Sequence, residues 1–202
     1  MLELTQEMVL ESSAVYWGKK PTPEERTALY EKDVQVNKLE RRIRKAVVAH
    51  MTGPVRRDVP YALLLMSLVK DVERLGDYAK NLSEVPGFAP CELPDDALVG
   101  ELREVARAVV VLVKEAARVY SESDVDRARE LTVEGRGVTK RCDQLIRDVA
   151  KSDYPAATVV YITIGTRFYK RMESHLLNLL SSVLMPLHKL DYYDEKALSG
   201  EG

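Results

Sequence analysis

The chain has 202 residues, of which 46% are hydrophobic and 31% charged, and its formal net charge is -2 at pH 7. This composition excludes a disordered chain, and the balanced charge gives no general attraction for nucleic acid. The two cysteines have no CxxC spacing, which argues against a disulfide framework or a cysteine-based zinc site and fits a reducing cytoplasm.

The N-terminal residues MLELTQEMVLESS carry glutamates early and no basic segment, so we expect no secretory signal. No apolar run reaches the roughly 18–20 residues of a membrane span. We therefore expect a soluble cytoplasmic protein that inserts no segment into a membrane. Attachment at the inner face of the membrane would then come through partners.

Three helices are predicted in the first half, because Leu, Val, Ala, Glu, Arg and Lys dominate between widely spaced breakers. Gly18 closes the first helix. Thr22 as N-cap and Pro23 in the first turn open the second, which Gly53 and Pro54 end. These helices are expected to cover residues 2–17, 23–51 and 59–85.

The segment PGFAPCELPDD, residues 86–96, is the predicted boundary between two halves. The runs AVVVLV and TVVYITIG beyond it are rich in β-branched residues and would also suit strands. Because the helical pattern continues on both sides of AVVVLV, helix is the preferred interpretation, and it is extended to TVVYITIG. The helices expected in this half cover residues 96–120, 125–151 and 156–190, followed by a polar tail.

The two halves resemble each other. ERLGDYAKNL, from Glu73, aligns with KRMESHLLNL, from Lys170, at an offset of 97, so that Arg74 meets Arg171. The pattern predicts an all-α protein of two tandem antiparallel three-helix bundles, residues 1–88 and 95–192, each with its own core. A shared amphipathic period is the alternative explanation of the match.

Polar residues with oxygen donors form a stripe on each of two neighbouring predicted helices, since residues i, i+4 and i+7 or i+8 share a face. Carboxylates held close together repel one another unless they are neutralised, and a metal ion would neutralise them. The alternative is a solvated face paired with lysine and arginine. The stripes are Glu73, Asp77, Asn81 and Glu84 on one helix, and Asp33, Asn37 and Glu40 on the other.

LLLMSLVKDVERLGDYAKNLSEV, residues 63–85, resembles the PhoU family of phosphate-uptake regulators, and EKDVQVNKLERRI, residues 31–43, resembles the family's preceding helix. The resemblance implies two three-helix bundles and a metal site on a bundle surface. The metal would be divalent or trivalent: iron, zinc or manganese. Gly76 occupies the motif's glycine, where a missing side chain allows close helix approach. The implied metal ligands are Glu73, Asp77, Asp33, Asn37 and Glu40.

The second half departs from the family pattern. Lys170 and Ser174 stand where the motif has its two carboxylates, and Arg136 aligns with Asp33. Only one metal site, in the first half, is therefore expected. Arg74 and Asn81, which recur in the second half as Arg171 and Asn178, are the candidate partner-binding residues.

No motif for catalysis is present. The three histidines lack the Glu-x-x-His pairs of di-iron bundles, and no P-loop, GxGxxG or HExxH occurs. Cys142 aligns with Leu39 and is expected in the core. We therefore expect no enzymatic activity.

The resemblance implies a regulator of phosphate uptake and signalling. Its partners would be a phosphate-specific ABC transporter or a phosphate-sensing histidine kinase. Two alternatives stay open: a regulatory or accessory domain of a coupled phosphate transporter, and a metal-free helical adaptor. Long amphipathic helices also make a homodimer plausible.

Two further surfaces are singled out. The run LERRIRKAVVAH carries Arg41, Arg42, Arg44 and Lys45, which form either a solvated helix face or a surface for an anionic partner. Tyr16 and Trp17 end the first helix and are expected to pack on the following loop, or to form a partner patch if they are exposed.

Overall fold

The computed structural model describes residues 1–53 and 58–185, and within them it is all-helical with no strand. This confirms the predicted fold class. Residues 186–190 of the last predicted helix, and the polar tail after them, lie outside the described residues. The helices are α1 (Leu2–Tyr16), α2 (Pro23–Thr52), α3 (Val59–Phe88), α4 (Ala97–Glu122), α5 (Val125–Val149) and α6 (Ala156–Leu184).

Side-chain caps set several helix starts. Thr22 is the predicted N-cap of α2: its hydroxyl accepts from the Glu25 N–H at 3.2 Å, and the Glu25 carboxylate accepts from the Thr22 N–H at 2.9 Å. Asp96 caps α4 in the same way by accepting from the N–H groups of Leu98 and Val99.

The predicted end of α3 at Val85 is wrong, because the helix continues through Pro86 to Phe88. A proline in the last turn removes only one backbone donor. The Ala89 N–H still donates to the Val85 carbonyl at 3.0 Å, which closes the turn beyond the proline.

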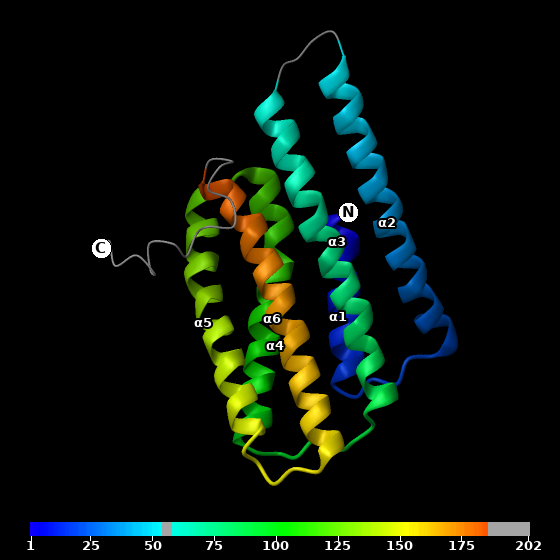
Figure 1. Ribbon diagram of the computed structural model, residues 1–202, viewed down its shortest axis with the longest axis vertical. Helices are drawn as coiled ribbons and strands as arrows, with labels where there is room; N and C mark the ends of the chain where they lie inside the picture. The colour runs from blue at the N-terminus through cyan, green and yellow to red at the C-terminus, as the bar shows by residue number, and fades with distance from the viewer. Residues whose placement is uncertain (54–57, 186–202) are drawn as a thin grey trace, which may run out of the picture.

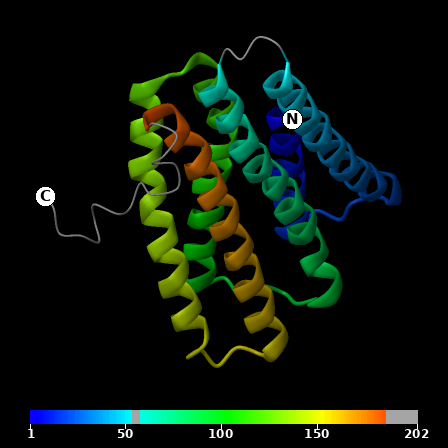
Figure 2. The same cartoon turned by 45° about the horizontal axis from the view of Figure 1, so that its top comes forward.

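The six helices lie side by side, with α3 and α6 packed against each other across the middle. α1 and α4 lie behind them, α5 flanks one side and α2 the other (Figures 1 and 2). The upper ends of α2 and α3 project beyond the other four helices (Figure 1). No helix in the described ranges has the length and apolarity needed to cross a membrane.

Both β-branched runs are helical, as predicted. In α4, Val105, Val109 and Leu112 are buried at helical spacing, and in α6 Ile162 is buried. Tertiary burial here outweighs the modest preference of β-branched residues for strands.

Apolar residues of both halves form one continuous core. Leu75 and Leu82 of α3 share it with Leu176 and Leu180 of α6, and all four are fully buried. The expectation that each half buries its own core is therefore wrong. Cys142 is in the core as predicted, and burial raises the pKa of its thiol to about 12.

The aromatic end of α1 belongs to this core and not to the following loop, contrary to expectation. The Tyr16 hydroxyl donates to the Tyr161 carbonyl at 3.1 Å, and the Tyr161 hydroxyl donates to the Tyr16 carbonyl. Trp17 Nε1 donates to the Tyr169 hydroxyl at 3.1 Å. Burial raises the pKa of Tyr161 to about 12.

Gly165, and not Gly76, is where a missing side chain decides the packing. A Cβ on Gly165 would lie 2.1 Å from the Tyr16 hydroxyl oxygen, which is inside contact distance. A Cβ on Gly76 would lie 3.5 Å from Val36 Cγ1, an ordinary van der Waals distance. The role expected for Gly76 from the family motif is therefore not required by this packing.

We predict that Gly165→Ala lowers the free energy of unfolding by about 1–3 kcal/mol, because the buried Tyr16 ring must move. The matched change Gly76→Ala should be neutral or stabilising by up to about 1 kcal/mol, since alanine favours helix. Urea denaturation of both variants measures the difference. Equal stabilities would contradict the packing described for Gly165.

Candidate functional site

The two predicted polar stripes face each other between α2 and α3. Glu73 and Asp77 lie one turn apart on α3, and Asp33 and Glu40 lie two turns apart on α2. Glu73 is only 7% exposed, Asp33 8% and Glu40 9%. An acidic side chain on a helix is normally solvated, but Glu73 does not face solvent, because α2 covers this face of α3. Asn37 lies half-buried between Asp33 and Glu40 on α2.

A lysine lies between each pair of facing carboxylates. Lys80 Nζ is 3.0 Å from Asp33 Oδ2 and 3.9 Å from Asp77 Oδ1. Lys70 Nζ is 2.7 Å from Glu73 Oε2 and 4.0 Å from Glu40 Oε1. Each ammonium group thus bridges one carboxylate of α2 and one of α3.

Two arginines extend these contacts into a continuous network. Arg74 joins the two α3 carboxylates, with Nη1 3.1 Å from Asp77 Oδ2 and Nε 3.8 Å from Glu73 Oε2. Arg44 Nη2 lies 2.9 Å from Glu40 Oε1. Four carboxylates and four cations therefore balance. We call this set the α2–α3 ion-pair network: Asp33, Glu40, Glu73, Asp77, Arg44, Lys70, Arg74 and Lys80.

Oxygen atoms with unused acceptor capacity remain inside the network. Glu40 Oε1 and Glu73 Oε2 are buried and, among the described residues, accept no hydrogen bond of good geometry, although cations lie near both. Carboxylate oxygens are donors that suit hard cations and iron. As the side chains lie, however, the described residues include no group of three or more His, Cys, Asp or Glu arranged to hold a metal.

The candidate partner-binding residues differ in exposure. The Arg74 side chain is 44% exposed although its guanidinium joins the network. Asn81 is half-buried one turn beyond Asp77. Arg74 is therefore the more accessible of the two.

Asp71 points away from the network, as its position relative to Glu73 predicts. Its Oδ1 lies 2.8 Å from His175 Nδ1 and accepts from Asn178 Nδ2 at 3.0 Å, both on α6. Tyr78 stacks on His175 with ring centroids 5.7 Å apart. We did not predict this polar link between the halves, because nothing in the spacing of these residues indicates that α3 and α6 are neighbours.

The sequence profile of the PhoU domain family matches residues 1–85. Residues 1–85 are thus similar to the PhoU domain. The matched range includes every residue of the α2–α3 ion-pair network, and the family resemblance carried by residues 31–43 and 63–85 is confirmed.

Two relatives extend the likeness beyond the PhoU domain. One is a protein of Thermotoga maritima described as phosphate-specific transport system accessory protein PhoU homolog 1, which is 24% identical over 162 residues, 76% of this chain and 69% of the relative. The other is an uncharacterized protein of Deinococcus radiodurans, 25% identical over 175 residues, 82% of this chain. This chain spans 61% of that relative.

The corresponding surface of α5 and α6 has different chemistry from the α2–α3 ion-pair network. Lys170, which aligns with Glu73, contacts Asp143 directly, with Nζ 2.6 and 2.7 Å from its two carboxylate oxygens. Nearby, the Thr139 hydroxyl donates to fully buried Glu173 at 2.7 Å. A lysine at the motif position pairs here with an acid of the neighbouring helix, so the carboxylate pair is absent.

We predict that Lys80→Met lowers the free energy of unfolding by about 1–3 kcal/mol, because Asp33 and Asp77 lose their shared counter-charge in a partly buried place. The control is Arg107→Met, which breaks an exposed pair with Glu104 and should change stability by less than about 0.5 kcal/mol. Adding Asp33→Asn to Lys80→Met should restore part of the loss. Chemical denaturation at low salt tests this, and equal effects of the two single variants would refute it.

Proposed function

We propose that the protein is a non-enzymatic accessory regulator of phosphate transport that acts by docking on another protein. The observation that carries this proposal is the match of residues 1–85 to the PhoU domain, together with the Thermotoga maritima relative described as a phosphate-specific transport system accessory protein. The partner we propose is a phosphate-specific ABC transporter or a phosphate-sensing histidine kinase, met at the cytoplasmic face of the membrane. Arg74, exposed at the edge of the network, is a candidate contact.

The test is phosphate uptake in the host cell. Deletion of the gene should raise uptake of labelled phosphate in phosphate-replete medium, because negative control is lost, and the wild-type gene should restore it. Unchanged uptake in the deletion strain would overturn the proposed regulation.

We further propose that the facing carboxylates bind iron, zinc or manganese by exchange for the two bridging ammonium groups. Asp33, Glu40, Glu73 and Asp77 would hold the metal, with Asn37 beside them. The metal would supply positive charge between α2 and α3 and so neutralise the acids. Two features support this: the gathering of four carboxylates, and the buried oxygens of Glu40 and Glu73 without hydrogen bonds among the described residues.

A metal-free helical adaptor is the second candidate, and the balanced ion-pair network favours it. If lysine and arginine already neutralise the acids, no metal is needed to hold α2 against α3. The two candidates differ in what happens when the bridging lysines are removed.

Under metal exchange, Lys70→Met with Lys80→Met should tighten Zn²⁺ or Mn²⁺ binding by at least about tenfold, since the competing cations are gone. Glu73→Ala with Asp77→Ala should abolish binding. Titration calorimetry with each metal alone and elemental analysis of chelator-free protein measure this. Glu101→Ala with Glu104→Ala on α4 is the control that should leave metal content unchanged.

The metal proposal fails if the Glu73 and Asp77 double variant keeps the metal content of the wild type. It also fails if the Lys70 and Lys80 double variant binds no metal and is only less stable. That second result is the one expected of the adaptor.

A further inference from the structure

α2 is long, but few of its residues are buried. Of its 30 residues only five are buried, and two of these are the carboxylates Asp33 and Glu40. α4, with 26 residues, buries nine, all of them apolar. α2 packs mainly on α3 and partly on α1, at the edge of the molecule (Figures 1 and 2). Because helices are stabilised in proteins mainly by burying an apolar face, α2 has an unusually large face left over.

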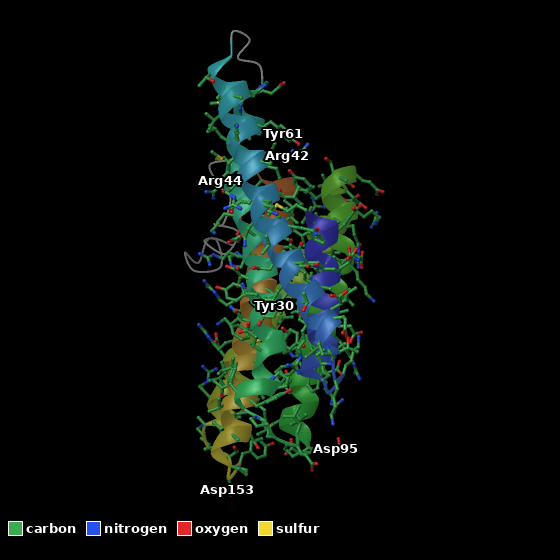
Figure 3. All side chains as sticks on the ribbon, turned by 90° about the vertical axis from the view of Figure 1, so that its right-hand side faces the viewer. Tyr30, Arg42, Arg44, Tyr61, Asp95 and Asp153 are labelled. Atoms are coloured by element: carbon green, nitrogen blue, oxygen red, sulfur yellow. The ribbon has the colours of Figure 1, made fainter. Side chains whose placement is uncertain are left out.

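The opposite side of α2 carries a regular exposed stripe. Its members recur at i, i+4, i+8, i+11, i+15 and i+18, so they share one face over about 27 Å of helix. The apolar members are exposed by 45 to 51%. Figure 3 looks onto this side of the molecule and shows Tyr30 on α2. We call this stripe the α2 outer face: Tyr30, Val34, Lys38, Arg41, Lys45 and Val48.

The middle of the α2 outer face is cationic. Within the part of the chain that the structure describes, Lys38, Arg41 and Lys45 are in no ion pair, whereas Lys70 and Lys80 on the opposite side of the interface are. From residue 41 to residue 57 the sequence has no Asp or Glu.

Apolar side chains stand at both ends of this cationic centre. Tyr30 and Val34 lie on its N-terminal side and Val48 on its C-terminal side. The Tyr30 hydroxyl donates to Glu84 of α3 at 2.6 Å, which ties this side chain to α3. The order along the helix is therefore apolar, cationic, apolar.

We propose that the α2 outer face binds a helix of a partner protein whose middle turns carry carboxylates and whose ends are apolar. The carboxylates would face Lys38, Arg41 and Lys45, and the apolar ends would cover Tyr30, Val34 and Val48. Such a helix would lie along α2 and present its own i, i+3, i+4 and i+7 residues to the stripe. This inference rests on the proposed docking function and adds the surface and the chemistry of the partner.

Charge and apolar content favour this occupant over two others. A second copy of the chain paired through the same face would bring cations against cations, whether the helices ran parallel or antiparallel about a two-fold axis. A lipid surface needs a continuous apolar face beside the cations, whereas here cations occupy the middle of the stripe.

The test uses a synthetic helical peptide of about 20 residues, long enough to span the face, with glutamates in its middle turns and leucines at its ends. Fluorescence anisotropy measures its binding to the full chain. Lys38→Glu with Arg41→Glu and Lys45→Glu should weaken binding at least about tenfold, because attraction becomes repulsion. The matched triple reversal at exposed positions on α5 and just after its end should leave binding within about twofold. Those control positions are Lys140, Arg147 and Lys151.

A peptide with glutamine in place of each glutamate should bind at least about tenfold more weakly to the wild type. Equal binding of the two peptides, or equal losses in both triple variants, would overturn the proposal. So would sedimentation of the protein with phosphatidylglycerol vesicles through Lys38, Arg41 and Lys45 when the acidic peptide does not bind.

The peptide-binding test in solution and the phosphate-uptake test in cells can fail independently of each other. If the peptide does not bind but the deletion strain loses control of uptake, only the α2 outer face is refuted. If the peptide binds as expected but deletion leaves uptake unchanged, the docking surface stands and the proposed phosphate function is the part that falls.

Discussion

A carboxylate removed from water must be neutralised, and this constraint organises the whole first half of the molecule. Asp33, Glu40 and Glu73 are nearly buried where α2 meets α3, and cations bridge them along the interface. α2 has few buried apolar residues of its own. Its position therefore depends more on these ionic contacts than the position of α4 does, since α4 buries leucine, valine and alanine. The same arrangement leaves the outer side of α2 open to a partner.

Helix identity and the acidic stripes could be predicted because they depend on local spacing. The N-cap at Thr22, the helical state of the β-branched runs and the acidic stripes on α2 and α3 all follow from periods of 3.6 residues and from capping chemistry. The continuation of α3 past Pro86 could not be predicted in this way. A proline in the last turn costs one hydrogen bond, and only the packed structure shows whether the turn survives.

Contacts between helices that are distant in the sequence could not be predicted from residue spacing. Asp71 lies on the side of α3 away from Glu73, and its partners His175 and Asn178 lie more than a hundred residues along the chain. The single core and the burial of Tyr16 could not be predicted for the same reason, because both depend on contacts between helices far apart in the sequence. The burial of Glu73 could not be predicted, because an acidic residue is normally solvated. Only the packing of α2 on α3 shows that Glu73 is covered and that Lys70 neutralises it.

The contact of Tyr16 with α6 also sets the order in which the chain can assemble. Tyr16 and Tyr161 exchange hydrogen bonds across 145 residues, so α1 cannot complete its packing until the last helix has been synthesised. Contacts of such sequence separation slow folding, because the loop between them must be closed before they stabilise anything. Tyr16 therefore stays uncovered by α6 while the first half of the chain is being synthesised, and the second half completes the core around it.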